Sequence, residues 1–73
     1  MPPKIRQLKA TLRKAGAYQV SQEGSHTKWK HFLVPSTILI LSGHDGDDAR
    51  PYQEKDVRKL LQQIAAAKKE LEL

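Results

Sequence analysis

Apolar residues recur every three or four positions near both ends of the chain, and this spacing predicts an amphipathic helix at each end. The first helix should begin near Lys4 and end at Gly16. Its apolar stripe consists of Ile5, Leu8, Leu12 and Ala15. The second helix should begin near Gln53 and fray over residues 68–71. Its apolar stripe consists of Val57, Leu60, Leu61, Ile64 and Leu71.

Three segments between the helices have the patterns of strands. Residues 17–22 alternate apolar with polar side chains, which predicts a half-buried strand. Residues 27–33 are rich in aromatic and branched side chains and predict a second strand. Residues 37–42 are almost continuously apolar, so a third strand there should be well covered. The predicted turns are residues 23–25, which contain a glycine, and residues 34–36, which contain a proline.

This order predicts an α+β fold of the form α-β-β-β-α, with a three-stranded antiparallel sheet. Both helices should cover one face of the sheet and leave the other face open to water. The arrangement resembles the double-stranded-RNA-binding domain. A chain of 73 residues is the length of one domain, so we expect a single domain over 1–73. Its core should span about residues 4–66, followed by a short charged C-terminal tail.

Composition narrows the function classes. The chain has no cysteine, which excludes disulfides, Fe–S clusters and a thiol nucleophile. The longest apolar run, residues 38–41, is far shorter than the ~18–20 residues of a membrane helix. The first residues lack the apolar segment of a secretory signal. We therefore expect a soluble cytoplasmic protein that makes no membrane contact.

The net charge of +5 is unevenly distributed. Residues 1–16 contain five basic residues and no acidic one, whereas residues 34–73 contain six basic and seven acidic residues. A basic N-terminal region favours a polyanionic partner, of which nucleic acid is the usual one. The alternative is a solvated surface that keeps a small protein soluble. As RNA contacts on the first helix we name Lys4, Arg6, Lys9 and Arg13.

The second strand carries the candidate chemistry. Because side chains alternate across a strand, Trp29 should face the helices. The opposite face then presents His26, Lys28 and Lys30 together. An imidazole can give or take a proton near neutral pH, and two ammonium groups can stabilise negative charge on a phosphate. We name His26 as the catalytic candidate, with RNA contacts at Ser25, Lys28 and Lys30.

A second histidine could complete an acid–base pair. If residues 34–36 form the whole turn, His26 lies opposite His44, and two imidazoles could cleave RNA through its 2′-hydroxyl without a metal. A one-residue slip would separate the two rings. The alternative for either residue is an exposed histidine without a catalytic role. His31 shares the parity of Trp29, so we expect it to be a partly buried structural residue.

The acidic segment at residues 44–48 invites a metal interpretation, but it lacks the spacing of a calcium loop. Zinc would require more histidines or cysteines. The pattern favours a solvated turn, and we expect no bound metal. The glycine-rich motifs of nucleotide-binding proteins and the serine-hydrolase elbow are missing from the sequence, so we expect no cofactor.

Several of these motifs together resemble a known family. A basic helix ending in Gly16 is followed by an aromatic residue at Tyr18, by Gly24-Ser25-His26, and by a second aromatic residue at Trp29. This order is similar to the HicA-type (YcfA-like) toxins, and the likeness covers roughly residues 4 to 66. His44-Asp45-Gly46 falls where these toxins have His-x-Gly before the last helix. The acidic pair that follows, Asp47-Asp48, departs from the family pattern.

The resemblance implies a function. HicA-type proteins are mRNA interferases of type II toxin–antitoxin modules, so His26 would be the histidine of a metal-independent endoribonuclease. The partners would be mRNA and a HicB-type antitoxin that covers the site. Two alternatives remain open at this stage. The chain could be a noncatalytic RNA-binding module of the same fold, or a domain whose basic face docks an acidic protein.

Overall fold

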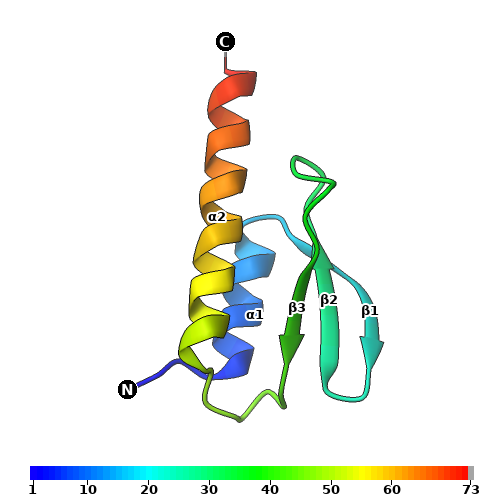
Figure 1. Ribbon diagram of the computed structural model, residues 1–73, viewed down its shortest axis with the longest axis vertical. Helices are drawn as coiled ribbons and strands as arrows, with labels where there is room; N and C mark the ends of the chain where they lie inside the picture. Colours follow the sequence, from blue (N-terminus) through cyan, green and yellow to red (C-terminus); the bar gives the residue numbers. More distant parts are fainter. Residues whose placement is uncertain (73) are drawn as a thin grey trace.

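The computed structural model describes residues 1–72, which form two helices and three strands in the predicted order. In chain order these are α1 (Ile5–Lys14), β1 (Tyr18–Glu23), β2 (His26–Lys30), β3 (Leu39–Ser42) and α2 (Pro51–Leu71). The strands form one antiparallel sheet in the order β1-β2-β3. Both helices lie on the same side of this sheet (Figure 1). The predicted α-β-β-β-α fold is confirmed.

The core lies between the helices and the covered face of the sheet. Trp29 is completely buried and is the largest of the fully buried side chains. It packs in a cluster to which α1 contributes Ile5, Leu8 and Leu12, and α2 contributes Val57, Leu60 and Ile64. Each of these triplets has the spacing of one helix face, as the helical periodicity of the sequence predicted. Leu71, which was also placed in the stripe of the last helix, is 72% exposed, so that part of the prediction is wrong.

The first strand differs from its prediction. All six residues of β1 are exposed, and only Ala17, just before the strand, is buried. The register with β2 shifts between Gln19 and Ser21, which leaves Val20 as a β-bulge. A bulge interrupts the strict alternation of a strand. The strand also lies at the edge of the sheet that is farther from the helices (Figure 1), so the predicted half-buried pattern is wrong.

The connection between β2 and β3 is longer than predicted. It spans residues 31–38 rather than 34–36, and both flanking strands are correspondingly shorter than expected. His31 turns the chain here, because its Nδ1 accepts a hydrogen bond from the Leu33 amide at 3.1 Å. The longer connection places His26 opposite Ser42. The predicted pairing of His26 with His44 is therefore wrong by two residues.

The last helix begins earlier and persists further than predicted. Pro51 is its first residue, a position that suits proline because no intrahelical partner is lost there. The Gln53 side chain accepts a hydrogen bond from the Arg50 amide at 2.8 Å and donates one to the Ser42 carbonyl at 2.7 Å. These contacts fix the start of α2 against the end of β3. Residues 68–71, predicted to fray, are helical.

Candidate functional site

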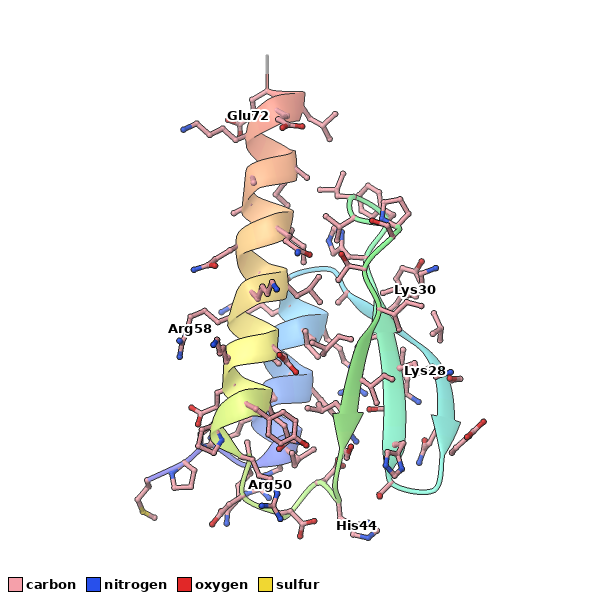
Figure 2. The ribbon with its side chains drawn as sticks, viewed as in Figure 1. Lys28, Lys30, His44, Arg50, Arg58 and Glu72 are labelled. Atoms are coloured by element: carbon pink, nitrogen blue, oxygen red, sulfur yellow. The ribbon has the colours of Figure 1, made fainter. Side chains whose placement is uncertain are left out.

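The open face of β2 carries the candidate catalytic residue. His26 and Lys28 are exposed and Lys30 is half-buried, whereas Thr27 and Trp29 between them are buried. This alternation confirms the predicted division of the strand between its two faces. Lys28 and Lys30 follow one another along β2 (Figure 2). The strand thus presents one imidazole and two ammonium groups in a row on the side away from the helices.

The covered side of β2 holds this row in place. The Trp29 indole Nε1 donates a hydrogen bond to Thr27 Oγ1 at 2.9 Å. That hydroxyl in turn donates to the Leu41 carbonyl on β3 at 3.1 Å. Every polar atom of this buried chain has a partner, which rigidifies a core more than apolar packing alone. The backbone that carries His26 and Lys28 is therefore anchored from behind.

His26 lines a small hollow on the open face, with a volume of about 190 Å³. The other lining residues are Ser21, Glu23, Lys28 and Ile40. Glu23 is the direct cross-strand partner of His26, because the turn between them contains only Gly24 and Ser25. Gly24 has φ +59°, the left-handed conformation that such two-residue turns favour.

Sequence reasoning did not select Glu23 as a site residue. The signal was present, since a two-residue turn at Gly24-Ser25 fixes the residues on either side of it as cross-strand partners. Treating residues 23–25 as one turn concealed this pairing. The hollow therefore contains a carboxylate, an imidazole and an ammonium group, rather than only the two kinds of group that were predicted.

His44 lies apart from this hollow. It follows the end of β3 (Figure 2), two residues beyond the partner of His26. It lines a different, polar hollow of about 390 Å³, to which α1 contributes Lys9 and Arg13. Ser25 also lines this second hollow, at the tip of the β1–β2 hairpin. The structure therefore does not bring the two histidines together as the predicted register required.

Three of the four basic residues predicted to contact RNA from the first helix are engaged within the protein. Lys4 forms an ion pair with Asp48, and Lys9 Nζ lies 2.6 Å from an Asp45 carboxylate oxygen. The Arg13 guanidinium lies over the Trp29 ring, 5.1 Å from its centre. Of the four RNA contacts predicted on this helix, only Arg6 has neither kind of partner among the contacts of residues 1–72.

The acidic loop at residues 44–48 caps α1. The Ile5 amide donates to the Asp47 carbonyl at 2.9 Å, and the Arg6 amide donates to the Asp45 carbonyl at 3.1 Å. These amides belong to the first helical turn, which has no intrahelical acceptors for them. The loop thus stabilises α1, a helix that has basic residues and no acidic one. Residues 44–48 are all exposed, so the predicted solvated turn is confirmed, and its contact with the start of α1 is an addition that sequence reasoning did not predict.

Lys9 also changes the protonation of its acidic partner. Its hydrogen bond and its charge hold the pKa of Asp45 below the usual value of 3.8. The charges of Arg13 and Arg6 lower the same pKa further. Asp45 therefore stays ionised against α1 at neutral pH, and the ion pair persists there.

His31 is structural, as predicted, and is more deeply buried than expected, at 1% exposed. Its Nε2 donates to the Ala15 carbonyl at 3.0 Å while Nδ1 accepts from the Leu33 amide. Gly16 approaches the ring closely, since a Cβ there would lie 3.0 Å from Nε2. Gly16 also has φ +92°, so glycine is required by both contact and conformation.

A comparison with models of protein families shows which family this chain belongs to. The family model described as the HicA toxin of bacterial toxin–antitoxin systems matches residues 5–65. The chain belongs to the HicA toxin family. The match begins with α1, includes all three strands and extends through most of α2. Comparison with curated proteins and with solved structures found no match.

The segment that matches the HicA family contains every candidate site residue except Lys4. Membership in this family assigns the chain to the toxin side of a toxin–antitoxin pair, whose other side is an antitoxin. Over residues 1–72, no group of three or more histidine or acidic side chains is arranged to hold a metal ion. In the same part of the chain, no helix is both long and apolar enough to cross a membrane.

Proposed function

We propose that this HicA-family protein is a cytoplasmic endoribonuclease that cleaves mRNA with His26 as a general acid or base. The observation that carries the proposal is the row of His26, Lys28 and Lys30 on the open face of β2. A flat, solvent-exposed sheet face admits a polymer more readily than a deep pocket does. His26 lines a hollow of about 190 Å³ on this face, and we place the phosphate of the cleaved bond there.

The chemistry requires few protein groups, because RNA carries its own nucleophile. The ribose 2′-hydroxyl attacks the adjacent phosphorus once its proton is removed, and the 5′-oxygen leaves once it gains a proton. An imidazole can serve either transfer near neutral pH. Lysine ammonium groups beside it stabilise the negative charge that develops on the phosphate oxygens. The reaction therefore proceeds without a metal ion or an organic cofactor.

The RNA contacts divide into two groups. Lys28, Lys30 and Ser25 lie on β2 and at the tip of its hairpin, and neither lysine belongs to an ion pair within residues 1–72. Lys4 and Lys9 would have to exchange Asp48 and Asp45 for phosphates. We assign the main contacts to the first group, and a steering role to α1, including Arg6 and Arg13.

The antitoxin in this proposal is a HicB-type protein that covers the open face. Two exposed apolar residues support this choice of surface: Ile40, which is 51% exposed opposite Lys28, and Ile38, which is 56% exposed just before β3. Exposed apolar side chains next to charged ones are typical of a protein contact. One surface would then bind either the RNA or the antitoxin. His44 keeps the role of a second acid–base candidate only if RNA binding brings it to the phosphate.

The test compares the wild-type protein with His26→Ala in RNA cleavage, in RNA binding and in growth arrest after expression. We expect cleavage to fall by about 10²- to 10⁴-fold while binding is retained, because one proton-transfer group is removed. Lys55→Ala, which removes a charge from the exposed surface of α2, is the matched control and should cleave normally. Unchanged cleavage in His26→Ala would contradict the proposal.

The alternatives give different results in the same experiment. A noncatalytic RNA-binding module would bind RNA but leave it intact in the wild type. A domain that docks only an acidic protein would fail to bind RNA even at low salt. Cleavage by the wild type that disappears with EDTA would overturn the metal-independent mechanism.

A further inference from the structure

The hollow beside His26 contains a carboxylate to which no role has been assigned. Glu23 is the cross-strand partner of His26 and is the one acidic residue that lines this hollow. Directly opposed residues of an antiparallel pair have Cβ atoms about 4.5–5.5 Å apart. Both side chains are exposed on the open face. A phosphate lying over the hairpin would therefore have a carboxylate on one side and an imidazole on the other.

Glu23 is not committed to another contact. The ion pairs of the described residues join Lys4 to Asp48 and Lys9 to Asp45, and neither includes Glu23. A stabilising surface carboxylate would be expected to pair with a lysine or cap a helix. Here it faces a basic row where it weakens the attraction of RNA, so its position has an electrostatic cost that a functional role would explain.

Cleavage of RNA through the 2′-hydroxyl needs a base and an acid on opposite sides of the phosphorus. His44, the other candidate for the second group, lines a different hollow with Lys9 and Arg13. Glu23 shares the hollow of His26. We infer that Glu23 is the general base and His26 the general acid of the cleavage reaction, which rests on the proposed function and completes it.

The proton transfers balance in this assignment. The Glu23 carboxylate removes the proton of the 2′-hydroxyl, and the 2′-oxygen forms a bond to phosphorus. The bond from phosphorus to the 5′-oxygen breaks, and the protonated imidazole of His26 gives its proton to that oxygen. The products are a 2′,3′-cyclic phosphate and a 5′-hydroxyl. Lys28, which lies two residues along β2 on the same face, stabilises the phosphate oxygens during the reaction.

The choice of leaving group separates the two roles. The substrates are a short RNA with one cleavage site, mapped with the wild-type protein, and the same RNA with sulfur in place of the bridging 5′-oxygen at that site. A thiolate leaves without being protonated, so a missing general acid matters little for the sulfur substrate. The general base is needed to activate the 2′-hydroxyl in both substrates, so its loss slows the cleavage of both.

We expect Glu23→Gln to lose at least about 10²-fold in cleavage of both substrates, with RNA binding unchanged or tighter. We expect His26→Ala to lose at least that much with the oxygen substrate and to recover most of it with the sulfur substrate. Glu70→Gln is the matched control, because it removes an acidic residue near the exposed end of α2, and it should cleave both substrates normally.

Four results would overturn the inference. Normal cleavage by Glu23→Gln would remove the residue from the reaction. Recovery of both Glu23→Gln and His26→Ala with the sulfur substrate would make Glu23 a residue that only positions the acid. Recovery of Glu23→Gln but not of His26→Ala would reverse the two roles. A wild-type protein that cleaves no RNA, so that no cleavage site can be mapped, would contradict the proposed function itself, which distinguishes that failure from the other three.

Discussion

The two faces of β2 differ in the burial and the contacts of their side chains. On the covered face, Thr27 and Trp29 are buried and joined by a hydrogen bond, so a substitution at either residue disturbs the core. On the open face, His26 and Lys28 are exposed and free of ion pairs within residues 1–72. The covered face thus stabilises the fold, while the open face is the surface that we propose binds RNA. Residues adjacent in sequence should therefore respond very differently to substitution.

Replacing Trp29 with alanine should lower the free energy of unfolding more than any other substitution considered. Removing a fully buried tryptophan typically costs about 3–5 kcal/mol in the free energy of unfolding. A domain of this size has a total stability of roughly 4–11 kcal/mol. Urea unfolding should therefore find Trp29→Ala unfolded or nearly so. Lys28→Ala, one residue away on the open face, should stay within about 0.5 kcal/mol of the wild type. Equal losses from the two variants would contradict the division of the strand.

Replacing Thr27 with valine should have a smaller effect through the same contact. Valine keeps the shape of threonine but leaves the buried Trp29 Nε1 without its acceptor. An unsatisfied buried donor costs about 1–3 kcal/mol. The control is Thr11→Val, because the Thr11 hydroxyl bonds the Gln7 carbonyl at the exposed surface of α1, where water can replace it. Thermal or urea unfolding that affected both variants equally would show that the buried hydrogen bond contributes nothing specific.

The salt dependence of RNA binding should distinguish the lysines of the open face from those of the first helix and its N-cap. Each cation that neutralises a phosphate of single-stranded RNA contributes about 0.7 to the slope of log affinity against log salt. Lys28→Ala and Lys30→Ala should each reduce the slope by about that amount. Lys4→Ala and Lys9→Ala should reduce it less, because their charges are already paired with Asp48 and Asp45. A filter-binding titration in which all four variants behave alike would contradict this ranking.

The smallest expected effect concerns the acidic loop and pH. Because Lys9 lowers the pKa of Asp45 below 3.8, the folded state binds fewer protons than the unfolded state in acid. The stabilisation by the ion pair is therefore present above about pH 3.8 and is lost as pH falls through the lowered value. Asp45→Asn should abolish this part of the acid dependence. Unfolding curves of the two proteins that remain parallel below pH 3.8 would contradict it.

The parts of the structure that the sequence predicted correctly depend on local rules. The alternation of His26, Lys28 and Trp29 followed from strand geometry together with the burial of the largest apolar side chain. The same rule held although the register of β2 with β3 was wrong, because a shift of two residues preserves the faces. Helix periodicity identified the buried apolar residues of α1 and α2 in the same way, although it also included the exposed Leu71.

The parts that were missed depend on contacts between distant segments. The connection at residues 31–38 begins at His31, which is held by a hydrogen bond to the carbonyl of Ala15, 16 positions earlier in the sequence. The acidic loop caps α1 through its carbonyls, so its partners lie about 40 positions away in the sequence. Glu23 is the exception, because its pairing with His26 follows from a local two-residue turn. Membership in the HicA family agrees with the fold but does not by itself assign these roles.

The central claim is that the open face performs the chemistry while the covered face maintains the fold. The most direct measurement is RNA cleavage in EDTA and urea unfolding on one preparation of His26→Ala, beside the wild type. We predict a loss of cleavage of about 10²- to 10⁴-fold with an unfolding free energy within about 0.5 kcal/mol of the wild-type value. Cleavage at the wild-type rate by a fully folded His26→Ala protein would contradict the account.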